Sequence, residues 1–155
     1  MATTNFYKAV QIIKDRLESN PLVNTTIFAK TNEKDLYKKQ IYPIAHIVPT
    51  SSPFINKNVT QHSFEVGAMN QRDIPATSKE TKFEGDDNVI DNLNTCHAII
   101  NDLVNYLYNR NNSDDRIELV SVGGFQPLLF TDFNILDGWV VTITLQIPND
   151  DICYE

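Results

Sequence analysis

Strict alternation near the C-terminus is the feature that most constrains the fold of this chain. Over residues 139–147, one set of positions forms an apolar stripe and the other a mainly polar one (Trp139, Val141, Ile143, Leu145 and Ile147 against Val140, Thr142, Thr144 and Gln146). A period of two residues predicts a β-strand with one buried face. Pro148 is expected to end the strand. The apolar stripe of this strand requires a second layer to cover it.

Two amphipathic helices can supply that layer. The clearer one covers 89–107, where apolar residues recur at spacings of four and three, with a broad flank (Val89, Leu93, Cys96, Ile100, Leu103 and Leu107, flanked by Ile90, Ile99 and Val104). The other is predicted to start after Thr4 as its N-cap and to end before Pro21, with the stripe Phe6, Val10, Ile13 and Leu17.

The remaining strands are shorter. Residues 22–30, 41–49, 58–69 and 116–122 have strand composition, and 41–49 with 58–69 should form a hairpin. Pro43 should face an edge or begin a strand, and a slip in the alternation near residue 62 suggests a bulge. The polar run 70–87 is expected to protrude as a loop, residues 31–40 and 125–137 are expected to be loops, and 149–155 a C-terminal tail.

These elements predict one α+β domain spanning 1–155, in the order α-β-β-β-α-β-β. It should contain a mixed, mainly antiparallel sheet of about five strands with two helices packed on one face. A length of 155 residues with 41% hydrophobic composition suits a single domain with a real core. The sequence has no apolar run long enough to span a membrane and no signal-peptide pattern, so a cytosolic protein is the default expectation.

Charge is distributed unevenly along the chain. Residues 1–60 contain 8 Lys/Arg and 4 Asp/Glu, a net charge of +4, whereas residues 61–155 contain 5 and 16, a net charge of −11. The total of −7 argues against a general nucleic-acid binder. The basic side of one copy could pack on the acidic side of another, a heterologous contact that can close into a ring. The alternative is that the loops merely happen to be acidic.

Catalytic signatures are missing from the sequence. It has no Gly-rich phosphate loop, no GxSxG, no HExxH and no CxxC, and Cys96 and Cys153 fit no metal or redox spacing. We therefore predict no catalytic, metal-binding or cofactor-binding residues, and no cofactor. The alternative is a small cytosolic enzyme or ligand-binding domain. In that case His46 or His62 would occupy a pocket beside Asp132 or Asp137.

Two segments carry a resemblance to a known family. The first runs from Ile41 through Pro49 to Phe54 and into the alternating strand at 58–69. The second is Leu-x-Gly-Trp at 136–139, followed by the alternating strand, Ile-Pro-Asn-Asp at 147–150 and Cys153. They resemble the tail-completion proteins of tailed bacteriophages, which include relatives of the tail terminator of the minor tail protein U type. The order of predicted elements agrees with that fold.

The resemblance implies a non-enzymatic virion protein of the tail or neck, assembled in the cytoplasm of the host bacterium. Its partners would be copies of itself in a ring (a hexamer or dodecamer) and adjacent neck or tail proteins. Genomic DNA would pass through the ring without sequence-specific binding, and no membrane would be involved. An adaptor that binds another protein through a sheet edge would share most of these features but would lack the ring symmetry.

Contacts between subunits are expected from the loop at 70–87 and from the C-terminal tail. The candidate interface residues are Arg72, Asp73, Lys79, Lys82, Phe83, Asp150, Asp151 and Tyr154.

Overall fold

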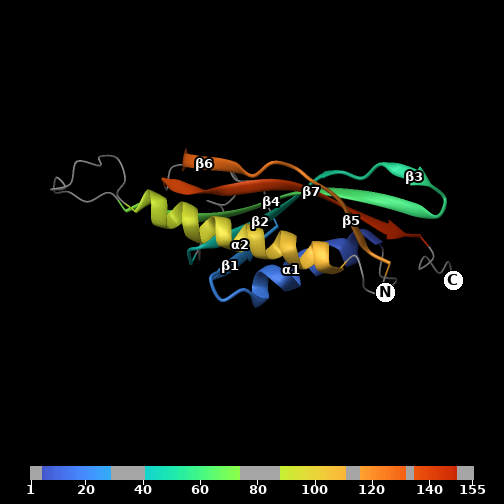
Figure 1. The fold of residues 1–155 in the computed structure, drawn as a ribbon, viewed down its shortest axis with the longest axis horizontal. Helices are drawn as coiled ribbons and strands as arrows, with labels where there is room; N and C mark the ends of the chain where they lie inside the picture. Colours follow the sequence, from blue (N-terminus) through green and yellow to red (C-terminus); the bar gives the residue numbers. More distant parts are fainter. Residues whose placement is uncertain (1–4, 29–40, 74–87, 111–115, 132–134, 150–155) are drawn as a thin grey trace.

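The computed structural model describes residues 5–28, 41–73, 88–110, 116–131 and 135–149. These residues form an α+β fold with two helices and one mixed sheet of seven strands (Figure 1). In chain order the elements are α1 (Asn5–Ser19), β1 (Thr25–Ile27), β2 (Ile44–Ser51), β3 (Phe54–Asn56), β4 (Val59–Gln71), α2 (Val89–Arg110), β5 (Glu118–Val122), β6 (Gln126–Thr131) and β7 (Leu136–Pro148).

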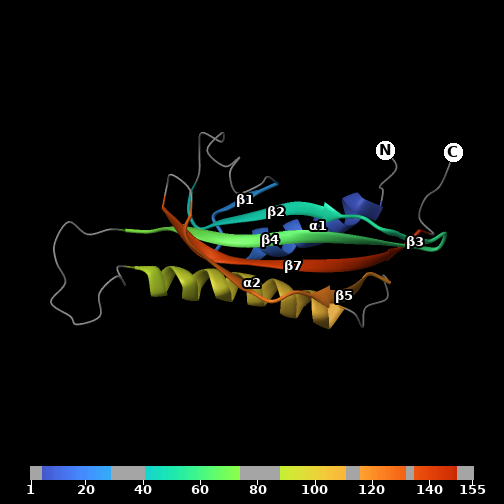
Figure 2. The ribbon, with the colours of Figure 1, turned by 90° about the horizontal axis from the view of Figure 1, so that it is seen from above.

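The sheet is built around one long antiparallel pair. β4 and β7 pair along their whole length, from Val59 opposite Pro148 to Gln71 opposite Leu136. The strand order is β1-β2-β4-β7-β5, with β3 beside β4 and β6 beside β7. Only β1 and β2 run parallel; the other pairs are antiparallel. Figure 2 shows β4 and β7 lying side by side along the long axis of the molecule.

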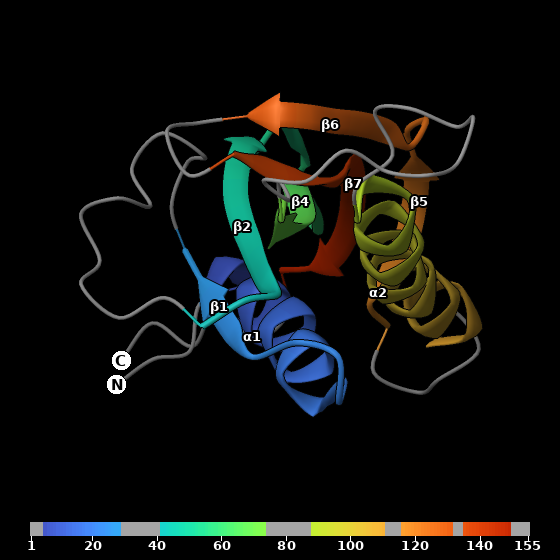
Figure 3. The same ribbon diagram turned by 90° about the vertical axis from the view of Figure 1, so that its left-hand side faces the viewer.

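Both helices cover the same face of this sheet (Figure 3). The core consists of alternate residues of the strands and one stripe of each helix (Ala45, Ile47, Phe64, Val66, Ala68, Val141, Ile143, Leu145 and Ile147 against Ala9, Ile13, Leu17, Cys96, Ile99, Ile100, Leu103 and Leu107). Each fully buried Leu, Ile or Phe contributes about 1.5–3 kcal/mol. The two predicted helices on one face of a mainly antiparallel sheet are thus confirmed.

Two glycines allow close packing within the sheet. A Cβ atom at Gly138 would lie 1.9 Å from the carbonyl oxygen of Ala68 on the neighbouring strand. At Gly67, a Cβ atom would lie 2.2 Å from Cε1 of His46, whose imidazole fills that space from β2. A side chain at either position would displace its neighbour, and at Gly138 the neighbour is backbone.

The patterns with the strongest periodicity were predicted correctly. The stripe of the last strand points into the core, although Trp139 at its start is only partly buried. The second helix extends from Val89 to Arg110. The predicted pairing of the two strands forms as β2 with β4, which are connected through β3 and the turn at 57–58, and Pro43 directly precedes β2.

The number of strands was underestimated, because residues 125–137 are not a loop. They contain β6 and the start of β7, which pair with each other through Gln126 opposite Val140 and Thr131 opposite Leu136. β6 lacks a clear period of two, so its pairing with the edge of β7 decides its structure. β3 is the other additional strand, and it pairs with β4 beside the tip of the hairpin. Within 22–28, the described part of the first predicted strand, only Thr25–Ile27 pairs with β2.

The predicted position of the bulge and the predicted buried stripe of the first helix were also wrong. The hairpin bulge lies in β2, between Pro49 and Ser51, whereas β4 continues in register through His62. His62 therefore shares the helix-covered face with Phe64. In α1 the buried stripe is shifted by one position at its start. Asn5 and Ala9 are buried in place of the predicted Phe6, which is partly exposed, and Val10, which is partly buried. The predicted Ile13 and Leu17 are buried. Thr4 and residues 31–40, 74–87 and 150–155 lie outside the described residues.

Candidate functional site

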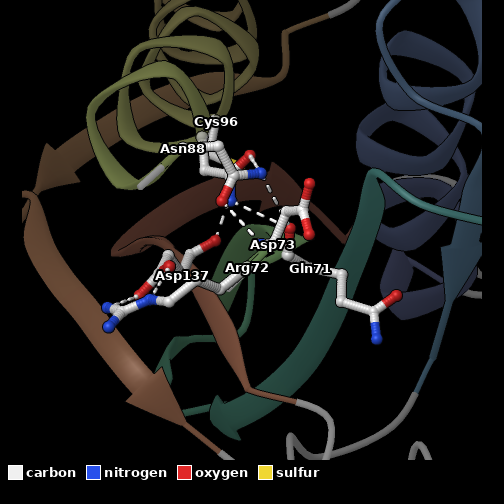
Figure 4. A network of polar contacts seen from close by, with 7 residues as sticks. Gln71, Arg72, Asp73, Asn88, Cys96 and Asp137 are labelled. Carbon is white, nitrogen blue, oxygen red and sulfur yellow. Dashed lines mark hydrogen bonds and ion pairs between the residues drawn. The ribbon is translucent and has the colours of Figure 1, made fainter. Parts of the chain in front are cut away.

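A polar network lies where α2 begins, β4 ends and β7 begins (Figure 4). Its centre is an ion pair in which Arg72 donates two hydrogen bonds to Asp137. Nε lies 2.8 Å from Oδ2, and the second nitrogen lies 2.7 Å from Oδ1. The Asp137 side chain is fully buried, and that of Arg72 is 15% exposed. A bidentate pair fixes the relative orientation of the two side chains. Because the Asp137 carboxylate is buried, loss of the Arg72 guanidinium would leave its negative charge uncompensated.

Two asparagine side chains complete the network, Asn92 in α2 and Asn88 directly before it. Asn92, which is buried, donates from Nδ2 to the carbonyl oxygen of Gln71 at 3.0 Å. Its Oδ1 accepts a hydrogen bond from Nδ2 of Asn70 at 2.9 Å. One turn earlier, Asn88 accepts a hydrogen bond from the backbone amide of Asp73 at 2.7 Å. We call Arg72, Asp137, Asn88 and Asn92 the base clasp.

The base clasp joins chain segments that are distant in sequence. Asp73 and Asn88 lie on either side of 74–87, so that segment leaves and re-enters the fold at one place. The amide of Arg72 also donates to the carbonyl oxygen of Ile135, 2.8 Å away, which fastens the entrance to β7. The clasp therefore fixes the two ends of the predicted protruding loop.

Cys96 borders the clasp but is not a reactive thiol. Its Sγ lies 3.8 Å from the carbonyl oxygen of Asp137, within the core. Burial, reinforced by the negative charge of Asp137, raises the pKa of Cys96 to about 12. The thiol is therefore neutral at physiological pH and serves as a small core side chain.

The structure does not bring either predicted histidine to Asp137. His62 lies opposite Leu145, and Asp137 opposite Asn70, so on the order of 26 Å of strand separates them at about 3.3 Å per residue. His46 lies opposite Gly67 on the face of the sheet turned away from the helices, whereas Asp137 faces α2. Asp132 lies outside the described residues.

Each histidine has a local structural environment. His46 is fully buried, and its Nε2 lies 3.7 Å from Oε1 of Glu65. His62 Nδ1 lies 2.9 Å from the hydroxyl of Ser52, and the ring packs edge-to-face against Phe6. Burial lowers the pKa of His62, which favours its neutral form. In the part of the chain that the structure describes, no three His, Cys, Asp or Glu side chains gather as a metal site would require.

A second polar cluster ties the tip of the hairpin to both ends of the described chain. Oδ1 of Asn149 accepts hydrogen bonds from Asn5 and from the hydroxyl of Thr60, each at 2.8 Å. Its Nδ2 donates to the carbonyl oxygens of Asn56 and Lys57. Asn149 therefore connects β7, the start of α1 and the turn between β3 and β4.

The fold places the strands of the two halves of the sequence on opposite sides of the sheet. β1, β2 and β3 come from residues 1–60, and β5, β6 and β7 from residues 61–155, with β4 between the two groups. Figure 3 shows α1 on the side of β1 and α2 on the side of β5. Among the described residues, those up to residue 60 contain 4 Lys/Arg and 2 Asp/Glu, a net charge of +2, and those from residue 61 onward contain 3 and 6, a net charge of −3.

The predicted interface residues are only partly visible. Arg72 and Asp73 are described: the Arg72 side chain is engaged with Asp137, and Asp73 is exposed at the end of β4. The others lie outside the described residues (Lys79, Lys82, Phe83, Asp150, Asp151 and Tyr154).

The base clasp was not foreseen, because Arg72 and Asp137 are 65 positions apart and no spacing connects them. One signal was present in the sequence. Asn88 and Asn92 are separated by one helical turn beside the apolar stripe of α2, where polar side chains need partners.

Comparison with known proteins finds no protein-family model that matches the chain, and no curated protein that matches it. Neither helix among the described elements is both long enough and apolar enough to cross a membrane.

Proposed function

We propose that this protein is a structural, non-enzymatic component of a bacteriophage virion. It forms an oligomeric ring around the DNA channel in the neck or tail, as a tail terminator, tail-completion or connector protein. The observation that carries this proposal is the charge difference between the two halves of the sequence, +4 for residues 1–60 and −11 for residues 61–155. In this proposal the basic half of one copy packs on the acidic half of the next, and such head-to-tail contacts form a closed ring if the rotation between neighbours allows.

The fold supports the same proposal. The resemblance implies a sheet covered on one face by two helices, and the described residues have that architecture. A long central β4–β7 pair with a packed core makes a subunit stiff enough to repeat in a ring.

The base clasp supports a role for the predicted loop, whose first two residues, Asn70 and Gln71, belong to β4, so that the loop proper begins at Arg72. Because hydrogen bonds of Arg72 and Asn88 anchor both ends of the loop to the core, the loop would contact a neighbouring subunit from a fixed position on the fold. In this proposal Asp73, Lys79, Lys82 and Phe83 contact the adjacent subunit, and the tail residues Asp150, Asp151 and Tyr154 contact an adjacent subunit or ring.

The acidic balance suits a DNA channel. A wall with net positive charge would bind the phosphate backbone and retain it, whereas a net charge of −7 per subunit lets DNA pass. The partners in this proposal are other copies of the chain, neighbouring neck or tail proteins, and DNA without sequence-specific contacts.

The oligomeric state of the purified chain tests the proposal directly. Light scattering after size-exclusion chromatography should show one discrete oligomer, and electron microscopy should show closed rings with a central hole. A protein that stays monomeric at high concentration and is absent from purified particles would contradict the proposal.

A further inference from the structure

We infer that His62 is an acid-sensitive contact between the first turn of α1 and the sheet. When His62 gains a proton, this turn separates from the sheet while α2 stays packed. Three elements meet at the ring: His62 belongs to β4, Phe6 packs against it from α1, and Ser52 bonds it from the connection between β2 and β3. We call these three residues the histidine latch. The inference concerns the single chain and does not rest on the proposed ring.

The surroundings of His62 suit a neutral ring. The residue is 6% exposed, and its Nδ1 lies 2.9 Å from the Ser52 hydroxyl, which can donate to the ring or accept from it. Among the described residues, no atom hydrogen-bonds Nε2, which is buried. In the protonated ring both nitrogens carry hydrogen. The N–H at Nε2 would then be a buried cationic donor without an acceptor, which is costly.

No charged side chain of the described residues faces the ring to compensate a proton on it. Glu65 on β4 points to the opposite face of the sheet, where it lies beside His46. Lys8 on α1 follows Phe6 by two positions, which is about 200° around the helix. The side chains on the His62 side of the sheet are uncharged (Phe6 from α1, Ser52 before β3, Phe64 on β4 and Leu145 opposite on β7).

The first turn of α1 is the element that can release the ring most easily. Phe6 is itself 36% exposed, and its ring lies against His62 and Phe64. The whole of α1 buries four side chains, whereas α2 buries seven. A helix held by less apolar burial opens at a lower free energy. β4 cannot move instead, because it is paired with β2 on one side and β7 on the other.

The direction of the effect follows from the two states of the latch. In the open state the ring is in water and has its ordinary pKa of 6.5, whereas burial lowers the pKa of His62 in the closed state. The open state therefore takes up the proton first as the pH falls. The ratio of open to closed chains should rise below about pH 6.5, by at most about tenfold per pH unit for one proton.

Hydrogen exchange of the full chain tests the latch. Backbone amides are followed from about pH 7.5 down to about pH 5.5, above the ordinary range of carboxylates, and each rate is divided by its intrinsic rate. Opening of the α1 amides after Phe6 should rise by up to about tenfold per pH unit below about pH 6.5, while α2 keeps its protection. An equal rise in α2 would show global unfolding, and no rise in α1 would show no latch. Either result overturns the inference.

Two histidine variants assign the effect. His62→Gln, which cannot titrate, should abolish the pH dependence of exchange in α1. His97→Gln, which changes an exposed histidine of α2, is the matched control and should leave that dependence unchanged. A dependence that survives in His62→Gln belongs to another group and overturns the inference.

Phe6→Ala tests the covering residue and keeps His62 in place. It should speed exchange in α1 at about pH 7.5 and make that exchange nearly independent of pH, because the ring then titrates in water in both states. In the wild-type chain, an NMR titration should find the His62 ring protonating below pH 6.5. A His62 ring that titrates at or above this value, or a Phe6→Ala chain that keeps the full pH dependence, overturns the inference even if His62→Gln does not fold.

Discussion

At the residue scale, Arg72 and Asp137 form a bidentate ion pair that is largely buried. Arg16 and Asp102 form a second bidentate pair between α1 and α2, but there both side chains are about one-third exposed. The Asp137 carboxylate is fully removed from water, so its stability depends on the Arg72 guanidinium.

Replacing Asp137 by Asn should destabilise the fold strongly, because it leaves the Arg72 charge mostly buried without its counter-ion. We expect a loss of about 3 kcal/mol in the free energy of unfolding, measured by urea denaturation. Asp102→Asn, which breaks the more exposed pair, is the control and should cost about 1 kcal/mol or less. Equal losses in the two variants would show that Asp137 has no special electrostatic role.

Gly138→Ala should be among the most damaging small substitutions. The added methyl group would overlap the carbonyl oxygen of Ala68, which cannot move without distorting the β4–β7 pair. We expect a loss of about 3 kcal/mol or more, measured by thermal or urea unfolding. Gly124→Ala has open space around the new Cβ and should change stability by less than about 0.5 kcal/mol.

His62 should make the stability depend on pH. Burial lowers its pKa from the ordinary 6.5, so the unfolded chain takes up a proton at a higher pH than the folded one. Stability should therefore fall as the pH drops below about 6.5, by at most about 1.4 kcal/mol per pH unit for one proton. His62→Gln should flatten the pH dependence of the unfolding midpoint in this range. An unchanged slope would assign the dependence to other groups.

At the element scale, the reliability of sequence prediction follows the strength of each pattern. The helix at 89–107 and the strand at 139–147 have long periodic stripes, and both were located correctly. β3 and β6 are formed by pairing with β4 and β7, and their own residues carry no clear period. The hairpin bulge was misplaced because a slip in alternation does not reveal which strand carries the extra residue.

The hairpin tip should depend on one asparagine. Asn149→Ala removes side-chain hydrogen bonds to Asn5, Thr60 and the turn, for an expected loss of about 1–3 kcal/mol. Hydrogen exchange should accelerate at the backbone amides of β3 and the turn, while the centre of β4 keeps its protection. Asn24→Ala, which removes a hydrogen bond to Tyr42 near β1, should leave exchange at the tip unchanged. Uniform acceleration across the sheet would indicate global destabilisation instead.

At the scale of the whole molecule, the strand order places the strands of the two halves of the sequence on opposite sides of β4. The hairpin keeps β2 and β3 on one side of β4, while β7 lies on the other side with β5 and β6 along it. A different strand order with the same composition would have interleaved the strands of the two halves.

In the proposed ring, where oppositely charged halves of neighbouring copies meet, association should depend on salt. Raising the ionic strength from about 0.05 M to 0.5 M screens charges beyond a few ångströms and should weaken the oligomer, as measured by light scattering against concentration. The free energy of unfolding of the dilute chain should change much less, because the core is apolar. Association that strengthens steadily with salt would indicate an apolar contact without the proposed charge pairing.

The amino-acid sequence by itself determined the α+β class, the two helices, the central strand and the charge difference between its halves, because periodicity and composition are local properties. Only the tertiary structure decided which strands become neighbours, where the bulge lies, that Arg72 meets Asp137, and that the strands of the two halves of the sequence lie on opposite sides of β4. These features depend on contacts between distant segments, and such contacts are selected by the burial and hydrogen bonding of the whole chain.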